Sequence, residues 1–424
     1  MRRIDLRSDP TADIPRPDPG AEPLDAVRRV LEKVRSEGDA ALRELTERFD
    51  GARLAGLRVD PAEIANAAAT APSDLLDTLT EAAARIRAVS EHQALEPWRA
   101  EIGGGIVGET VHAVERAGIY VPGGRAAYPS SVLMCAVPAK VAGVGSVALC
   151  TPPAPDGSVP QATLAAAHIA AVDEVYRIGG AQAIAAMAFG TESIRKVDVI
   201  VGPGNLYVAL AKREVAGLVQ IDSIAGPSEI AVVTGRADPA VLAADLIAQA
   251  EHGPHGSFLL ITWSDALADE VGEALEKTMA EIAATDDLRD ALEEGTVAVL
   301  VSGPEQALDA VNRFAPEHVE LIFDHAERAL GRLTNAGAVF VGPWSPVSLG
   351  DYLAGSNHVL PTAGAGRHAS GLRTSHFQKA TAFVVYDRPG LERALPFVRS
   401  FAAAEGLPNH ARALEVRLLD GKAP

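Results

Sequence analysis

The sequence predicts an α/β protein, because short apolar segments alternate with Ala-rich helical stretches over most of its length. From Ala117 the apolar segments are GIYV, SVALC, EVYRI and DVIVG, and from residue 229 they are EIAVV, FLLIT, VAVLV, VELIF and AVFVG. Alternating strands and helices are typical of parallel sheets covered by helices. Since the alternation starts twice, we expect two incomplete Rossmann-like, doubly wound domains, with a ligand crevice between their strand ends.

The rest of the chain adds small helical segments at both ends. Residues 24–95 place apolar side chains at the spacing of amphipathic helices, and a last helical segment precedes the C-terminus. The length of 424 residues exceeds that of most single domains. The expected division is an N-terminal arm over 1–23, a first Rossmann-like domain over 24–112 and 229–375, a second over 113–228, and a C-terminal segment over 376–424.

Composition argues against several classes of protein. Fifty-six acidic and 38 basic residues give a net charge of -18, which repels nucleic acids and anionic membranes. The charged N-terminus does not fit a secretory signal, and no apolar run is long enough to span a membrane. We therefore expect a cytoplasmic protein without nucleic-acid or membrane partners.

The two cysteines also limit the choice of metal ligands. Cys135 and Cys150 lack CxxC spacing, so they form neither a disulfide framework nor a thiolate zinc cage, and we expect both to be buried. Any bound metal must therefore have nitrogen and oxygen ligands.

Three glycine-containing turns, YVPGG, IGGAQ and GPGNLY, follow predicted strands. Because parallel strands end at a common edge, these turns bring Tyr120, Gln182 and Asn205 to the same side of one sheet. GPGNLY follows a strand and opens a helix, as a dinucleotide fingerprint requires, but its last position is Tyr. The pattern fits either a dinucleotide contact or ordinary glycine turns.

Histidine is concentrated late in the sequence, where eight of eleven follow residue 250. In DLIAQAEHGPHG, Gln249 and His252 are three residues apart on the last turn of a predicted helix and share a face. Such a pair fits part of a nitrogen and oxygen zinc site. The alternative is a histidine that favours the negative end of the helix dipole.

Two later segments offer further ligands. GDYLAGSNHVLPT contains Asp351 and His358, and EGLPNH contains Glu405 and His410. A carboxylate and a second imidazole from these segments would complete a four-ligand zinc set with the helical pair. Each residue taken alone also fits an ordinary surface position.

Glu317 and His318 stand side by side in APEHVELI, directly before a predicted strand. Adjacent side chains point in different directions, so we expect no ion pair between them. They fit two bases that serve one substrate, or a solvated surface pair. Ser228, in AGPSE, lacks the GxSxG elbow, which favours a polar substrate contact or a turn former over a nucleophile.

Nine motifs in order resemble those of histidinol dehydrogenases over about residues 120–410, namely GIYVPGG, YPSSVLM, GGAQAIAA, GPGNLYV, AGPSE, QAEHGP, PEHVEL, GDYLAGSNHVLPT and EGLPNH. The resemblance implies a four-electron oxidation of L-histidinol to L-histidine through bound L-histidinaldehyde, with two NAD, as the last step of histidine biosynthesis. It also implies a homodimer with one zinc ion per subunit, in which C-terminal residues complete the neighbouring site.

The resemblance assigns roles to individual residues. Its implied zinc ligands are Gln249, His252, Asp351 and His410. Its implied bases are His318, which removes the alcohol proton, and Glu317, which activates water. Its implied NAD contacts are Tyr120, Gln182 and Asn205. Its implied substrate contacts are Ser228, His318, His358, Glu405 and the four zinc ligands. It assigns no role to His255, His368 or His376.

Two other functions remain open at this point. One is a zinc-dependent NAD alcohol dehydrogenase that acts on another substrate and releases an aldehyde. The other is a metal or small-ligand binding module without enzymatic activity.

Overall fold

The computed structural model describes residues 1–17, 22–123, 127–224 and 226–419. Gly124 of the YVPGG turn and Ala225 of the AGPSE motif lie outside the described residues, as do short parts of the expected N-terminal arm and C-terminal segment. The chain forms two compact units, described here one at a time. The first comprises Met1–Gln93 and Val114–Phe377, and the second comprises Ala94–Ala113 and Gln378–Pro424.

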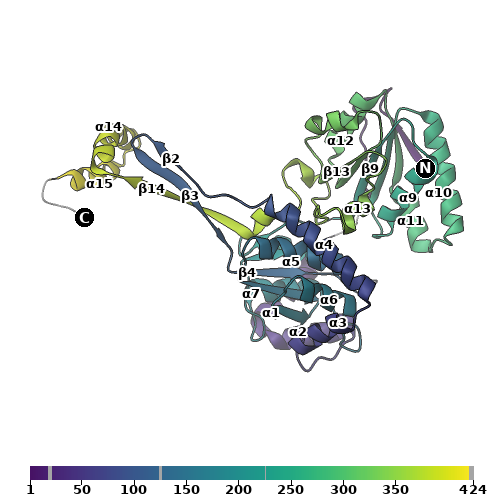
Figure 1. Ribbon diagram of the computed structural model, residues 1–424, viewed down its shortest axis with the longest axis horizontal. Helices are drawn as coiled ribbons and strands as arrows, with labels where there is room; N and C mark the ends of the chain where they lie inside the picture. The colour runs from purple at the N-terminus through teal and green to yellow at the C-terminus, as the bar shows by residue number, and fades with distance from the viewer. Residues whose placement is uncertain (18–21, 124–126, 225, 420–424) are drawn as a thin grey trace. The chain divides into compact units, whose positions relative to one another are not determined.

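The first unit contains a six-stranded sheet in the order β1-β11-β10-β9-β12-β13 (Figure 1). All its strand pairs are parallel. Its strands are β1 (Arg2–Asp5), β9 (Glu229–Val233), β10 (Ser257–Thr262), β11 (Thr296–Leu300), β12 (His318–Leu321) and β13 (Ala338–Val341). Its helices are α9 (Pro239–Ala250), α10 (Asp265–Glu281), α11 (Asp286–Gly295), α12 (Pro304–Phe314) and α13 (Val347–Tyr352).

Two apolar cores cover the two faces of this sheet. Alternate residues of β9 enter different cores: Val232 packs with α9, α10 and α11, whereas Val233 packs with α12. This alternation follows from the two-residue period of a strand. Strands covered on both faces are uniformly apolar, which explains the continuous apolar segments of the sequence.

The first unit also contains a five-stranded parallel sheet in the order β6-β5-β4-β7-β8. Its strands are β4 (Arg116–Tyr120), β5 (Ser146–Thr151), β6 (Glu174–Arg177), β7 (Val199–Val201) and β8 (Gln220–Ile221). The helices between them are α5 (Pro129–Val141), α6 (Gln161–Ile169), α7 (Gly180–Phe189) and α8 (Leu206–Val215). These elements match the βα alternation expected for this part of the chain.

The N-terminal helices pack on the five-stranded sheet, which differs from the expected division that grouped residues 24–112 with 229–375. These helices are α1 (Leu24–Glu37), α2 (Asp39–Asp50), α3 (Pro61–Thr70) and α4 (Ser73–Glu91). α1 contacts α7 and α8, α3 contacts α6, and α4 contacts α5. Their periodicity identified them as helices but contained no information about which sheet they cover.

Strand β1 lies in the N-terminal arm, where no strand was expected. It pairs in parallel with β11, with Arg2 opposite Val297 and Ile4 opposite Val299. Its apolar content is too small to stand out in the sequence. The remaining short elements are three 3₁₀ helices, η1 (Ala326–Arg332), η2 (Ala365–Arg367) and η3 (Thr374–Phe377).

The second unit is an antiparallel sheet in the order β14-β3-β2 with two helices. Its elements are β2 (Trp98–Ile102), β3 (Gly105–Ala113), β14 (Gln378–Tyr386), α14 (Arg388–Ala404) and α15 (Pro408–Leu418). The two helices pack together near the turn between β2 and β3, where Arg393 donates to the carbonyl of Gly104 (Figure 1). The expected C-terminal segment is therefore helical only after β14, a strand that was not predicted from the sequence.

Other structural features agree with the composition. Cys135 and Cys150 are buried free thiols, and burial raises the pKa of Cys150 to about 12. Within the described ranges, no helix has both the length and the apolar character needed to cross a membrane.

A substitution at Gly202 can test the structure of the turn that follows β7. It has a φ of +115°, and a Cβ there would lie 2.1 Å from the carbonyl oxygen of Tyr120. Gly202→Ala should therefore lower the free energy of unfolding by on the order of 3 kcal/mol, because strain and a backbone clash combine. Gly217 is the matched control, since its φ is +95° but a Cβ there would have no atom within 4 Å. Gly217→Ala should cost only about 1 kcal/mol, and equal losses in chemical denaturation would contradict this explanation.

Candidate functional site

Several of the residues expected to bind metal and transfer protons lie near one another at the amino edge of the six-stranded sheet, because His252 and His358 affect the pKa of His318 and Asp351 affects that of Glu317. α9 follows β9 and runs back, so the end of α9 returns to the edge where β12 begins. Gln249 lies in the last turn of α9, and His318 is the first residue of β12. Ligands of open α/β sheets usually bind at the carboxyl edge, so a fold-level rule alone would have pointed to the opposite edge.

Glu317 and His318 reach this edge because α12 ends abruptly. Ala315 adopts a left-handed conformation with a φ of +55°, and the following Pro316 cannot continue the helix. The next two residues enter β12 with side chains that are only 7% and 4% exposed. The alternative of a solvated surface pair is therefore wrong.

Both side chains bind the backbone of Glu229. The amide of Glu229 donates to Glu317 Oε2 over 3.1 Å, and the Nδ1 atom of His318 lies 3.0 Å from the Glu229 carbonyl oxygen. A carbonyl only accepts, so Nδ1 carries the proton and Nε2 of the neutral ring is left as the basic atom.

Burial disfavours charge on both groups. It raises the pKa of Glu317 well above its usual range, and it lowers the pKa of His318 to about 3. The two side chains approach to 3.5 Å between His318 Nδ1 and Glu317 Oε2, so they do not point apart as expected from their adjacency. Because burial disfavours the protonated imidazole, the carboxyl group contacts a neutral ring.

Arg16 binds Glu229 from the N-terminal arm. Its guanidinium pairs with the buried Glu229 carboxylate, donates to the carbonyl of Phe314 over 2.6 Å, and stacks 3.8 Å from the centre of the Phe314 ring. Neither Arg16 nor Glu229 was predicted from the sequence. The only available signal was the position of Glu229 directly after Ser228.

Gln249 provides an unpaired acceptor at the site. Its side chain is 1% exposed, and its Oε1 atom has no hydrogen-bond partner among the described residues. Leaving a buried polar atom unpaired costs roughly 1–3 kcal/mol, so this oxygen is suited to a cation. His252 lies just past the cap of α9 rather than on its last turn, and partial burial of its ring lowers its pKa.

Asp351 and His358 come from α13 and the loop after it. Burial raises the pKa of Asp351 to about 6 and lowers that of His358 to about 4. The Nδ1 atom of His358 lies 3.0 Å from the Asp351 carbonyl, and its Nε2 lies 3.3 Å from the hydroxyl of Ser131 in α5. Ser131, part of the YPSSVLM motif but not predicted as a site residue, thus links the helix after β4 to this loop.

These donors fit a zinc ion by their chemistry. An amide oxygen, a neutral imidazole and a carboxylate are suitable ligands for Zn²⁺. In the part of the chain that the structure describes, no three His, Cys, Asp or Glu side chains form a metal cluster.

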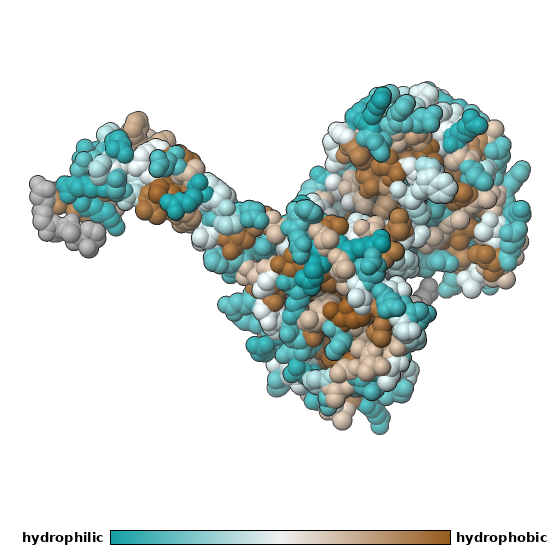
Figure 2. Space-filling model, in the orientation of Figure 1, coloured by the Kyte–Doolittle hydropathy of each residue, from teal (hydrophilic) through white to brown (hydrophobic). Residues whose placement is uncertain are grey.

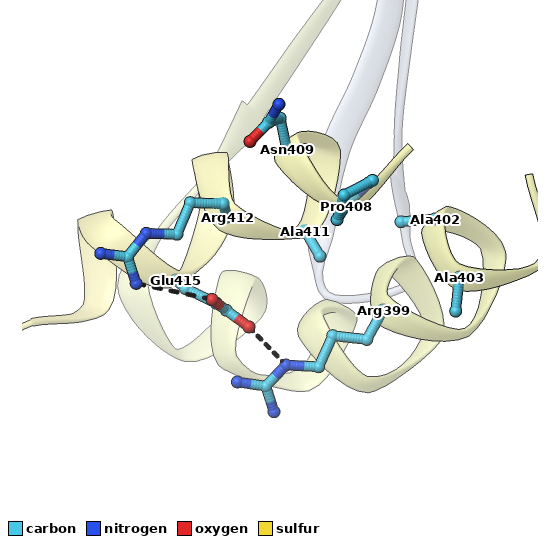
Figure 3. A pocket seen from close by; sticks show the side chains of 8 residues that line it. All are labelled: Arg399, Ala402, Ala403, Pro408, Asn409, Ala411, Arg412 and Glu415. Atoms are coloured by element: carbon cyan, nitrogen blue, oxygen red, sulfur yellow. Dashed lines mark hydrogen bonds and ion pairs between the residues drawn. The ribbon is translucent and has the colours of Figure 1, made fainter. Parts of the chain in front are cut away.

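Glu405 and His410 belong to the second unit, so their place beside the other residues stays a prediction. Glu405 caps α14, His410 lies in the first turn of α15, and both are exposed. A groove of about 500 Å³ between these helices includes neither of them (Figure 3). Arg399 and Glu415, which both line the groove, form an ion pair over 2.7 Å.

The three expected dinucleotide contacts all follow strands at the carboxyl edge of the five-stranded sheet. The hydroxyl of Tyr120 accepts the amide of Gly180 over 3.1 Å, and Gln182 is buried beside that turn. Asn205 is exposed and caps α8 by accepting the amide of Val208 over 3.2 Å. Buried Tyr120 and Gln182 thus stabilise the turn at Gly180, while Asn205 is exposed to solvent.

A buried ion pair that was not predicted from the sequence supports the GPGN turn. Asp222 accepts the amide of Gly202 over 2.7 Å, Lys212 donates to the carbonyl of Gly202 over 3.0 Å, and the two side chains pair. The amide and the carbonyl group of Gly202 are therefore both bound by this ion pair.

Ser228 is half-buried, and its carbonyl accepts the amide of Ser257 over 3.0 Å, which sets the start of β9 against β10. The three histidines without an assigned role are partly or fully exposed. His255 contacts Glu294 at 3.3 Å, His376 accepts the amide of Arg373 at 3.2 Å, and His368 is exposed.

A pair of carboxyl groups lies near His318, because Glu320 is two residues further along β12. Glu320 in β12 accepts the amide of Val347, the first residue of α13, over 2.8 Å. Its other carboxyl oxygen has no hydrogen-bond partner among the described residues. Burial and the neighbouring Asp245 of α9 raise the pKa of Glu320 to about 8, and burial raises the pKa of Asp245.

Comparison with known proteins identifies the family. A family model described as histidinol dehydrogenase matches residues 18–418. The histidinol dehydrogenase of Geobacillus kaustophilus is 47% identical over 399 residues, which cover 94% of each chain. That of a Synechococcus strain is 46% identical over 397 residues, covering 92% of this chain and 91% of that protein. A crystal structure of histidinol dehydrogenase from Elizabethkingia anophelis has a TM-score of 0.92 at 34% identity, covering 99% of this chain and 98% of that one.

These findings define the chain as an oxidoreductase built on Rossmann-like α/β sheets, which confirms the expected fold class. It belongs to the histidinol dehydrogenase family, the oxidoreductases of histidine biosynthesis. The resemblance drawn from the nine motifs is thereby confirmed.

The Glu320 pair predicts a loss of stability at alkaline pH. Between the ordinary carboxyl pKa of about 4.3 and the folded value, the folded chain keeps a proton that the unfolded chain has released. Stability from this group is therefore complete below the lower pKa and is lost as the pH rises to about 8. Glu320→Gln cannot ionise. Between pH 5 and 8.5, the free energy of unfolding should therefore decrease less in this variant than in the wild type, by on the order of 2 kcal/mol.

Urea denaturation of metal-free protein at both pH values measures this effect. Glu270→Gln, which removes an exposed carboxylate from α10, is the control and should follow the wild type. Parallel pH dependences for Glu320→Gln and the wild type would rule out the raised pKa of Glu320 as the cause.

Proposed function

We propose that this chain oxidises L-histidinol to L-histidine in two NAD-linked steps and keeps L-histidinaldehyde bound between them. The observation that carries the proposal is the buried, neutral His318, whose Nδ1 is fixed by the Glu229 carbonyl and whose Nε2 is left as a base. Membership of the histidinol dehydrogenase family supports it.

His318 would remove the proton from the substrate alcohol. A general base must be unprotonated at the working pH, and the low pKa of the ring meets this requirement. The loss of the hydroxyl proton makes it easier for the carbinol carbon to lose hydride, which yields the aldehyde.

Glu317 would act on the water that attacks the aldehyde. Its carboxyl oxygen lies 3.5 Å from the His318 ring, so both groups can serve the same carbon in succession. Water addition gives a gem-diol, which has a hydrogen on carbon that leaves as the second hydride, and the acid results. Buried Glu317 must first release its proton, which a nearby positive charge would favour.

Zinc would be held by Gln249, His252 and Asp351 together with His410 of a second subunit. The unpaired oxygen of Gln249 and the half-buried carboxyl group of Asp351 support this set. A bound Zn²⁺ ion would orient the amine and imidazole of the substrate and add positive charge beside the carboxyl groups. His358, Ser228 and Glu405 would contact the substrate.

NAD would bind at the carboxyl edge of the five-stranded sheet as the hydride acceptor. Asn205 is exposed there, while buried Tyr120 and Gln182 shape the turn at Gly180. The six-stranded part of the unit would thus bind metal and transfer protons, and the five-stranded part would bind the dinucleotide.

The second unit would pair with a second copy of the chain in a cytoplasmic homodimer. Apolar side chains lie on its surface (Figure 2), and Val384, Phe397 and Phe401 are at least 65% exposed. A contiguous exposed apolar surface is typical of an interface. In this dimer, Glu405 and His410 would complete the site of the neighbouring subunit.

The first prediction is the yield of NADH from L-histidinol with purified, zinc-loaded protein. Two NADH per L-histidinol, abolished by a chelator, are expected because the bound aldehyde is oxidised before release. One NADH with free aldehyde would indicate a simple alcohol dehydrogenase, and none would indicate a binding module. Sedimentation of the same sample should show a dimer.

The second prediction concerns His318. His318→Asn should lower kcat by about 10²- to 10⁴-fold, because a positioned general base is lost. His376→Asn is the control, since that imidazole is part of no proposed step, and its kcat should stay near the wild-type value. Near-normal turnover by the His318 variant would remove this residue from its role.

A further inference from the structure

We infer that Arg16 is a positioning residue for both bases, which it orients through the backbone of Glu229. The inference rests on the proposed roles of Glu317 and His318. The geometry supports it in three steps, from the backbone of residue 229 to its side chain and then to α12.

The backbone of Glu229 orients both bases at once. Its amide donates to Glu317, and its carbonyl accepts from His318, over 3.1 and 3.0 Å. These two groups belong to the peptide units on either side of one Cα atom. A small rotation at residue 229 would therefore displace both bases together.

Residue 229 is the first residue of β9 and pairs with Ser257 of β10, so the sheet fixes its backbone on that side. A side-chain anchor adds a second constraint at this end of the strand. The anchor is Arg16, which contacts both carboxylate oxygens of Glu229 through two guanidinium nitrogens. Such a bidentate pair fixes direction as well as distance.

The same guanidinium also holds the end of α12. It donates to the carbonyl of Phe314 over 2.6 Å and stacks on the Phe314 ring. Phe314 precedes Glu317 by only three residues. Arg16 thus connects the start of β9 to the segment that delivers the bases, and it fixes the bases and their backbone partners relative to each other.

Arg16→Met in the full-length, zinc-loaded enzyme tests this role. Its kcat should fall by about 10- to 100-fold, since small displacements of reacting groups slow a reaction strongly. The KM for L-histidinol should change by less than about threefold, because the metal ligands and substrate contacts remain. The zinc content, measured on the same sample, should equal that of the wild type.

The control is Arg7→Met, which removes an arginine from the same N-terminal segment. Arg7 pairs with Asp5 and Asp265 at the surface, away from the bases. This variant should keep the kcat of the wild type. Wild-type kcat in Arg16→Met as well would overturn the inference.

A double variant separates positioning from simple charge compensation. Arg16→Met leaves the Glu229 carboxylate buried and unpaired, which should lower the thermal unfolding midpoint. Adding Glu229→Gln removes that charge and should restore the midpoint, while kcat stays low because the link to α12 is still absent. Recovery of kcat together with the midpoint would show that Arg16 is only a counter-ion, and would overturn the inference.

These outcomes are distinct from failure of the proposed function. If the wild type forms no NADH from L-histidinol, the proposed function fails. If the wild type is active and His318→Asn is not, but Arg16→Met retains full kcat, only the inference about Arg16 fails.

Discussion

The site depends on one constraint of parallel sheets: a strand that runs one way must be followed by a helix that runs back. This return brings the end of α9 toward the beginning of β12, so that His252, just past α9, lies close enough to His318 to lower its pKa although the two are far apart in the sequence. In the five-stranded sheet, the expected dinucleotide contacts lie at the opposite, carboxyl edge, where the strands end in glycine turns. The hydrogen bond from Ser131 to His358 links the helix that begins at that edge with the loop that follows Asp351.

Burial then determines the chemistry available at this edge. The low dielectric of the interior disfavours charge on any group that lacks a close partner. His318 donates a hydrogen bond to the backbone and Glu317 accepts one, and burial disfavours the charged form of both. The ion pairs of Arg16 with Glu229 and of Lys212 with Asp222 hold backbone groups in place, although burial still raises the pKa of Glu229.

Much of the fold was predictable because periodicity reports local structure. The continuous apolar segments predicted the parallel strands, and the turn residues placed Tyr120, Gln182 and Asn205 at one edge. The antiparallel sheet of the second unit was not predictable in this way, because β14 pairs with β3 from a distant part of the chain. Likewise, helical periodicity in α1 to α4 could not reveal which sheet they cover.

The site was predictable only where residue type implies chemistry. Histidines and carboxylates near strand starts and in loops drew attention, so Glu317, His318 and Asp351 were predicted as site residues. Arg16, Glu229, Glu320 and Lys212 were missed, because an ion pair between distant segments leaves no local pattern. Their contacts depend on the tertiary structure: the side chains of Arg16, Glu320 and Lys212 bind backbone groups of distant segments, and the backbone amide of Glu229 binds Glu317.

The N-terminal strand has a consequence for the order in which the chain can fold. β1 is synthesised long before its partner β11, which begins only at Thr296, and Arg16 is synthesised before its partners Glu229 and Phe314. Until the ribosome has passed these residues, β1 and Arg16 have no place to dock. They are thus among the last residues to reach their final positions, and the bases are held in full only once they arrive.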